Sequence, residues 1–159
     1  MDEANKHAFI EVLSEILEQF AFVFLEEEPG PVDPPEDGSP LLAEISFSSQ
    51  NRSGRLVMAA SPSLCAEVAE NVLGEDDQGH LPEDANRNAL QEVVNIACGN
   101  LLARLYGTEE MFELSVPTSH EISAEEWRTV GNSEDAISLS AEEEPLVARL
   151  ILEQGENKK

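Results

Sequence analysis

Basic residues are scarce in this sequence, which has nine lysines and arginines against 33 aspartates and glutamates. The formal net charge is −24 over 159 residues. Binding to the phosphate backbone of nucleic acid needs a basic surface, so we expect no nucleic-acid partner and, for the same reason, no anionic membrane surface. A basic or metal-loaded protein partner remains compatible with this charge. High solubility or a salty habitat explains the charge without any partner.

Cysteine is also rare, and the two cysteines, Cys65 and Cys98, each lie in an apolar helical pattern without a second cysteine nearby. Such residues are typical of reduced core positions in an intracellular protein. The first residues, MDEANKHAFIEVL, lack the basic start and apolar run of a secretion signal. No apolar run approaches the roughly 20 residues that a membrane span needs. We therefore expect a cytoplasmic protein.

Residues with metal-ligand spacing are lacking as well. The histidines, His7, His80 and His120, form no ligand pairs with each other or with the cysteines. The segment GEDDQGHLPED at 74–84 lacks the Asp-x-Asp-x-Asp-Gly spacing of a calcium loop, which favours a solvated acidic loop. There is no phosphate-binding glycine loop and no nucleophile elbow. We expect the chain to bind no metal and no cofactor of its own.

The first half of the chain contains clear helical and strand patterns. Residues 4–25 are predicted to form a helix, because apolar residues recur at helical spacing: Phe9, Val12, Leu13, Ile16, Leu17 and Phe20. Residues 26–40 hold five of the nine prolines and six acidic residues, which is typical of a loop. A hairpin is predicted over 41–61. A helix then begins at the N-cap Ser61, with Pro62 at its first position, and stops at Gly74.

The second half predicts one long helix followed by strands. The helix spans about 82–106 and ends at Gly107. Residues 111–123 alternate like a strand, which Pro117 restricts to an edge or a bulge. Trp127 lies in a polar segment, expected to be a loop, where it covers the sheet or contacts a partner; we favour the cover. A second hairpin over 136–154, turning near Glu143 to Pro145, precedes a frayed tail at 155–159.

These patterns form a single domain, residues 1–159, of the α+β class, in which a mostly antiparallel sheet packs against long helices. The long helix has two contrasting faces at about 100° per residue. Its apolar face contains Leu90, Val94, Ala97, Leu101 and Leu105, and the opposite face contains Asn88, Glu92, Asn95, Gly99 and Ala103.

The face with Gly99 contains poor helix formers. A glycine inside a helix costs roughly 1 kcal/mol relative to alanine, and the adjacent Asn100 is also unfavourable there. Two interpretations remain open. One is a solvated face with a small-residue contact to another helix of the domain. The other is a surface that a partner approaches closely, where it meets the carboxylate of Glu92 and the amide of Asn95.

The segment LQEVVNIACGNLLA, with Glu92, Asn95, Gly99 and Asn100, resembles the signature helix of the CheC/CheX/FliY family of chemotaxis phosphatases. It is most similar to the CheX type, which has a single such helix. The hairpin before a short helix ending in ENVLG, the strand LSVPTSHEI and the final hairpin follow the same order. Two features depart from the family: Asn88 stands where Asp or Ser is frequent, and the acidic insert at 26–40 is longer than expected.

The resemblance implies a CheC-like fold and hydrolysis of the aspartyl-phosphate of a CheY-like response regulator in chemotaxis or two-component signalling. It implies that Asn95 orients the attacking water and that Glu92 pairs with the regulator's lysine. Asn88, Gly99 and Ala103 are then partner-binding residues, and the phosphorylated regulator supplies the Mg²⁺.

The resemblance also implies a homodimer formed through the sheets, for which the apolar strand LVARLILE is expected to offer an edge. Two other functions stay open. One is a non-catalytic adaptor or switch component that binds a regulator, and the other is an acidic structural domain that only oligomerises.

Overall fold

The computed structural model describes residues 3–72 and 84–153, except for the side chain of Phe20. The elements in chain order are α1 (Glu3–Ala21), β1 (Leu25–Glu27), β2 (Leu41–Ser48), β3 (Ser53–Ala60), α2 (Pro62–Val72), α3 (Ala85–Tyr106), β4 (Glu113–Leu114), β5 (Thr118–Glu121), α4 (Ala124–Gly131), β6 (Ala136–Ala141) and β7 (Glu144–Glu153).

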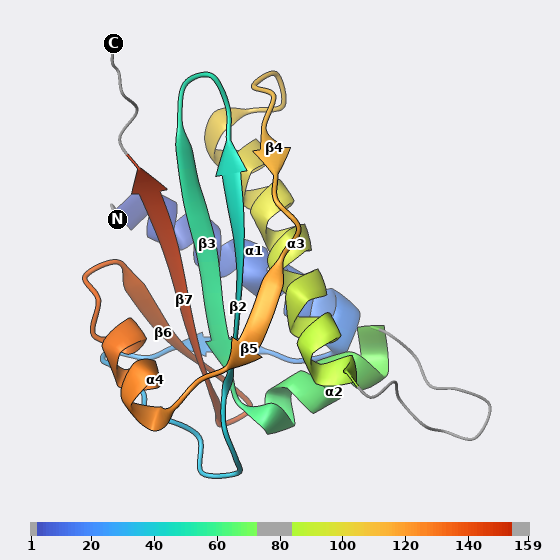
Figure 1. Cartoon of the computed structure of the whole chain (residues 1–159), viewed down its shortest axis with the longest axis vertical. Helices are drawn as coiled ribbons and strands as arrows, with labels where there is room; N and C mark the ends of the chain where they lie inside the picture. The colour runs from blue at the N-terminus through green and yellow to red at the C-terminus, as the bar shows by residue number, and fades with distance from the viewer. Residues whose placement is uncertain (1–2, 73–83, 154–159) are drawn as a thin grey trace, which may run out of the picture.

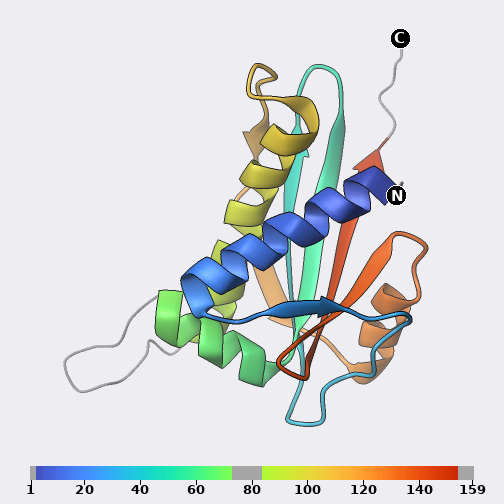
Figure 2. The ribbon, with the colours of Figure 1, turned by 180° about the vertical axis from the view of Figure 1, so that it is seen from behind.

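All seven strands belong to one antiparallel sheet. Its order is β1-β6-β7-β3-β2-β4, and β5 pairs with β2 next to β4 on the same edge. The helices α1, α2 and α3 cover one face, whereas α4 lies on the other face near one end (Figures 1 and 2). This architecture confirms the α+β prediction of a mostly antiparallel sheet packed against long helices.

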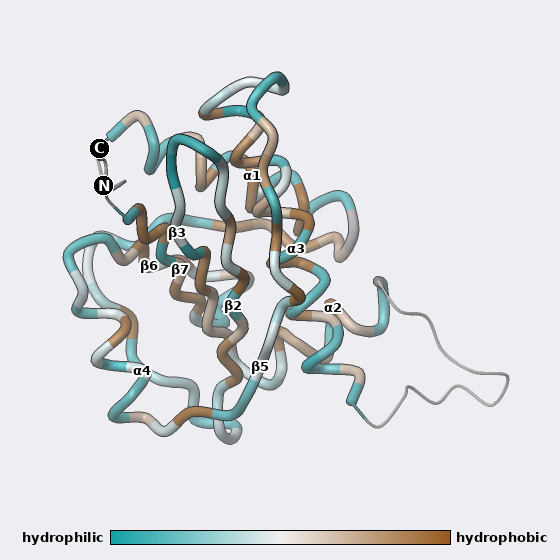
Figure 3. Tube along the Cα trace, turned by 45° about the horizontal axis from the view of Figure 1, so that its top comes forward, coloured by the Kyte–Doolittle hydropathy of each residue, from teal (hydrophilic) through white to brown (hydrophobic). Residues whose placement is uncertain are grey.

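The main core lies between the sheet and the three helices. In β2 the side chains of alternate residues, such as Ile45 and Phe47, point into this core, as the two-residue period of a strand requires. The predicted apolar face of α1 is confirmed for Phe9, Val12, Leu13, Ile16 and Leu17; the side chain of Phe20 lies outside the described part. Hydrophobic residues concentrate in the body of the sheet, and the β2–β3 turn is hydrophilic (Figure 3).

A smaller apolar cluster occupies the opposite face of the sheet, beneath α4. Trp127 is fully buried there, and its indole N–H donates to the carbonyl oxygen of Val32 at 3.0 Å. The predicted cover over the sheet is therefore confirmed. The predicted loop is wrong, because Trp127 lies in α4, whose first turn has a capping box between Ser123 and Glu126.

The first helix ends four residues earlier than predicted. Phe22 has a left-handed backbone (φ 58°), so the chain reverses there and Val23 turns into the core. The next residues form the short edge strand β1, which pairs with β6. The sequence prediction placed the start of this strand in the helix and the rest in the 26–40 loop.

The strand predicted over 111–123 is interrupted at Pro117. Both of its parts pair with β2 at the sheet edge, but the register changes by one residue between Leu114 and Thr118. Pro117 thus lies at the edge of the sheet, in the bulge between β4 and β5, which confirms the restriction that was expected of it.

The final hairpin turn begins one residue earlier and ends two residues earlier than the predicted segment 143–145. Ala141 pairs with Glu144, so the turn consists of Glu142 and Glu143, and Pro145 lies inside β7. The expectation that LVARLILE is an open sheet edge is also wrong, because β7 lies between β6 and β3. The edges of the sheet are β1 on one side and β4 with β5 on the other.

The start of the second helix at Ser61 is confirmed, because its hydroxyl accepts from the backbone N–H of Leu64 at 3.1 Å. The long helix begins at Ala85, after the N-cap Asp84, rather than at about Pro82 as predicted. Three other predictions lie outside the described residues: the stop of the second helix at Gly74, nearly all of the acidic segment 74–84, and the frayed tail at 155–159. Within 3–72 and 84–153, no helix is long and apolar enough to span a membrane.

The β6–β7 turn generates a stability prediction. Both of its residues have positive φ, 52° at Glu142 and 77° at Glu143, a two-residue turn for which Asn-Gly is preferred. We expect Glu142→Asn with Glu143→Gly to raise the free energy of unfolding by about 1 kcal/mol. The expected rise in Tm, measured by thermal melting, is about 2–4 °C.

The control is Glu142→Gln with Glu143→Gln, which removes both charges and keeps the unfavourable backbone. The control is needed because burial, together with the carboxylates of Glu142, Glu70 and Glu144, raises the pKa of Glu67. An equal rise in Tm for the Gln pair would assign the gain to charge rather than to backbone conformation.

Candidate functional site

The long helix α3 presents two chemically different faces, as predicted. Its buried residues include Leu90, Val94, Ala97 and Leu101, whereas Leu105 is half-buried at the margin. On the opposite face the structure leaves five residues exposed in one line, which we call the α3 stripe: Asn88, Glu92, Asn95, Gly99 and Ala103. The structure therefore brings together every residue that the sequence assigned to the site.

Polar contacts hold α3 on both sides of the stripe. On one side, the Arg104 guanidinium contacts the carboxylates of Glu11 at 2.6 Å and Glu15 at 3.5 Å, both from α1. On the other side, the Gln91 amide donates to the Ser119 hydroxyl of β5 at 2.7 Å, and Arg87 donates to the Ser119 carbonyl at 3.4 Å. The sequence analysis missed these anchors, although polar residues at the margins of an apolar face signal such roles.

The C-terminal end of α3 is held by the β2–β3 turn. The Arg52 guanidinium stacks 3.9 Å from the centre of the Tyr106 ring and donates to the Glu110 carboxylate at 3.0 Å. The hydroxyl of Ser49 also donates to Glu110, and these donors hold the pKa of that carboxyl below its usual range. The helix then stops at Gly107, which has a φ of 82°. The α3 stripe is thus part of a helix that is fixed at its sides and its end.

The position that a side chain would occupy at Gly99 is open space in the described part of the chain. A Cβ added at this residue would meet no atom within 4 Å. The interpretation in which small residues here contact another helix of the domain is therefore wrong for Gly99. The packing of the described chain therefore does not require a glycine at this position.

The side chains of Glu92 and Asn95 are both exposed. Among the residues that the structure describes, neither side chain has a hydrogen bond or an ion pair. Residues three apart on a helix lie about 5–6 Å from each other at Cβ, so the two groups form one carboxylate–amide pair. The carboxylate accepts hydrogen bonds from a cation, and the amide both donates and accepts.

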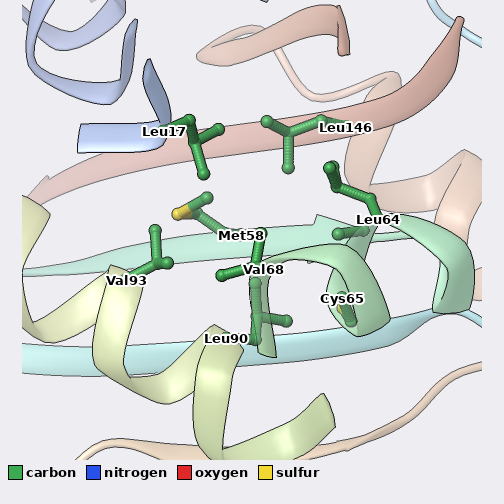
Figure 4. Close-up of a pocket in the computed structure, with 9 residues that line it drawn as sticks. Leu17, Met58, Leu64, Cys65, Val68, Leu90, Val93 and Leu146 are labelled. Atoms are coloured by element: carbon green, nitrogen blue, oxygen red, sulfur yellow. The ribbon is translucent and has the colours of Figure 1, made fainter. Parts of the chain in front are cut away.

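A small cavity in the core does not form a ligand site. It lies between α1, α2, α3, β3 and β7, and its walls are apolar side chains and the Cys65 thiol (Figure 4). Its volume is about 10 Å³, at the lower limit for a single water, and it has no polar partner for one. This cavity therefore has no role in binding a ligand.

The cysteines fit the expected core positions. Cys65 and Cys98 are free thiols, and burial raises the pKa of each to about 12, with a further contribution from Asp37 at Cys65. Both thiols are therefore neutral and poor nucleophiles. Within the described ranges, no group of three or more His, Cys, Asp or Glu is placed to hold a metal ion; the expected absence of a bound metal stays a prediction.

Comparison with known proteins gives one family match and several structural matches. The family described as "Chemotaxis phosphatase CheX" matches residues 41–138. The chain is similar to CheX from Desulfovibrio desulfuricans, with a TM-score of 0.65, 17% identity, and coverage of 94% of this chain and 99% of that chain. It is also similar to a CheC-like superfamily protein from Shewanella sp. PV-4, with a TM-score of 0.67, 17% identity, and coverage of 96% of this chain and 99% of that chain.

A third similar structure is the CheX–CheY–BeF3–Mg²⁺ complex from Borrelia burgdorferi, with a TM-score of 0.64, 16% identity, and coverage of 94% of this chain and 98% of that chain. No curated protein matches the sequence. The structural matches show a CheC-like fold. The family match covers more than half of the chain and includes all of α3. The chain therefore belongs to the CheX family of chemotaxis phosphatases.

Proposed function

We propose that this protein hydrolyses the aspartyl-phosphate of a CheY-like response regulator that docks on the α3 stripe. One observation carries the proposal: Glu92 and Asn95 form an exposed pair, without partners in the described chain, on a helix that is held firmly on both sides. Membership of the CheX family supports the reaction. The CheX–CheY complex of a protein with the same fold supports the partner.

Asn95 is proposed to orient the attacking water. Phosphoryl transfer needs an in-line nucleophile and neutralisation of charge on the phosphoryl oxygens. An amide can accept a hydrogen bond from the water and donate one to a phosphoryl oxygen, because it has both kinds of group. The rigid backbone of α3 lets Asn95 hold this position without reorganisation during the reaction. The regulator supplies the Mg²⁺ and the phosphorylated aspartate.

Glu92 is proposed to fix the docking register by pairing with a lysine of the regulator. A carboxylate and an ammonium form a charge-assisted hydrogen bond. Gly99 and Ala103 leave a smooth surface beside this pair, so the regulator can approach the helix backbone closely. Asn88 adds an amide one turn before Glu92, in place of the Asp or Ser that is frequent in the family. A non-catalytic adaptor would use the same surface without hydrolysis.

Substitution of Asn95 tests catalysis. We expect Asn95→Ala to slow dephosphorylation by roughly 100-fold or more, because a positioning group of this kind acts mainly in the transition state. Its affinity for the regulator should change little. Glu92→Ala should weaken both binding and rate, since it removes an ion pair made on docking. Phosphate release from a phosphorylated, Mg²⁺-loaded CheY-like regulator measures both effects.

The matched control is Asn100→Ala, an exposed asparagine on the same helix but about 140° away from Asn95 around its axis. It should retain wild-type activity. All three variants should melt near the wild-type temperature, because exposed substitutions usually change stability by about 0.5 kcal/mol or less. A folded Asn95→Ala variant with full activity would refute the catalytic role. Tight binding without hydrolysis by the unaltered protein would identify the adaptor.

Gly99→Ala should have opposite effects on the stability of the fold and on binding of the regulator. The open space around Gly99 predicts that alanine raises the free energy of unfolding by about 0.5–1 kcal/mol through helix propensity. The same methyl group should weaken regulator binding, because it occupies the surface of closest approach. Denaturant unfolding and a binding titration measure the two effects. A variant that is more stable and binds equally well would remove Gly99 from the docking surface.

We also propose the homodimer that was expected from the sequence, but with the two chains associating through the edge strand β1 instead of β7. Phe22 and Phe24 beside β1 are 70% and 61% exposed, and burial of such aromatic surface favours association. We expect light scattering to give the mass of two chains, and Phe22→Ser with Phe24→Ser to give one. Because each chain carries a charge of −24, added salt should tighten the dimer. A one-chain mass for the unaltered protein at micromolar concentration would exclude it.

A further inference from the structure

Three exposed apolar side chains follow the end of α3. Six large hydrophobic residues are exposed in the described chain, and three of them lie within 111–116: Met111 and Val116, each 83% exposed, and Leu114, 39% exposed. This segment forms the sheet edge that runs beside α3 (Figure 1). Exposed apolar side chains gathered on one short segment mark an interaction site more often than scattered ones do.

The bulge in this edge determines where Val116 points. Ser115 is level with Ser46, since its N–H donates to the Ser46 carbonyl at 2.9 Å, and Thr118 is paired with Glu44. Val116 and Pro117 therefore lie together opposite Ile45, a core residue on the α3 side of the sheet. Bulges of this two-to-one kind re-aim side chains and are frequent beside active sites.

Two contacts fix the level of Val116 along α3. At one end Ser119 contacts Gln91, and at the other end Phe112 packs 5.9 Å from Tyr106, ring centre to ring centre. At about 3.3 Å per strand residue and 1.5 Å per helix residue, the two segments have nearly equal length and run in opposite directions. Val116 is then level with residues 97–98 of α3.

The side of α3 on which Val116 lies can be inferred from the same contact between Gln91 and Ser119. Gln91 marks the side of α3 that faces the sheet edge, and Asn95 is the member of the Glu92–Asn95 pair that lies nearer to that side at 100° per residue. Val116 therefore borders the α3 stripe next to Asn95 and Gly99. The apolar segment continues along the same border toward the C-terminal end of α3.

We propose that Met111, Leu114 and Val116 form an apolar ridge that contacts the CheY-like regulator when it docks on the α3 stripe, with Val116 as the main anchor. This inference rests on the proposed function, and continuity of the ridge with the α3 stripe identifies the occupant. A rigid protein that reaches Asn95 over the smooth surface at Gly99 must also cover Val116. The Glu92–Asn95 pair then sets the docking position and takes part in hydrolysis, whereas the ridge supplies binding affinity.

The test uses a CheY-like regulator loaded with Mg²⁺ and BeF3, together with phosphate release from the phosphorylated regulator. We expect Val116→Ser to raise the Kd by roughly tenfold or more, as for a central apolar anchor of an interface. The rate at saturating regulator should be unchanged, so KM rises while kcat stays constant. Met111→Ser should give a smaller effect in the same direction.

Leu152→Ser is the matched control, because Leu152 is 42% exposed but lies on β7, with β3 and β2 between it and the α3 edge. It should leave Kd unchanged. Val116→Thr, which keeps the branched shape suited to a strand, should show an intermediate Kd and a wild-type melt. This second variant separates loss of contact from loss of folding.

If Val116→Ser binds the regulator as tightly as the unaltered protein while Asn95→Ala is inactive, the proposed ridge is refuted and the proposed function stands. A lower kcat with unchanged Kd would also overturn it, because the ridge is assigned to binding alone. If the unaltered protein neither binds nor dephosphorylates any CheY-like regulator of its organism, the proposed function fails and the ridge fails with it.

Discussion

Burial of one face of α3 against the sheet and the other helices is the constraint on which the rest of the site depends. Leu90, Val94, Ala97 and Leu101 are all buried, and their removal from water fixes the rotation of the helix about its axis. A rotation of one residue, about 100°, would bury the carboxylate of Glu92 at a large desolvation cost. The exposure of the Glu92–Asn95 pair therefore follows from the packing on the opposite side.

The edge strand makes this helix face into a defined surface. Pairing of β4 and β5 with β2 places residues 113–121 beside α3, and the Gln91–Ser119 hydrogen bond fixes the level of the two elements. The opposite face of the sheet packs against a second core under α4, where Trp127 is fully buried. Fixed backbones on both sides hold the polar pair and the proposed apolar ridge in one geometry, as the proposed positioning of a reactive water requires.

The α3 stripe was predictable from sequence because a helical period acts within one element and needs no knowledge of its partners. The hairpin of β2 and β3 and the cap at Ser61 were predictable for the same reason. The strand β1 was not, since three residues with two exposed glutamates give no periodic signal. The helix α4 had a readable capping box that was missed. The exposure of Val116 depends on a register change that only the pairing with β2 reveals.

Local departures from regular structure divide into two groups. The positive φ values at Phe22, Glu142 and Glu143 each accompany the end of an element, where the chain must reverse. Gly99 lies inside a helix, and the bulge at Val116 lies between β4 and β5, which both pair with β2 in the same direction, so neither accompanies a reversal of the chain. A sequence that breaks a local rule without gain to its own fold does so most often at a functional site. These two departures border the same surface, next to Asn95, which supports the proposed docking of a partner there.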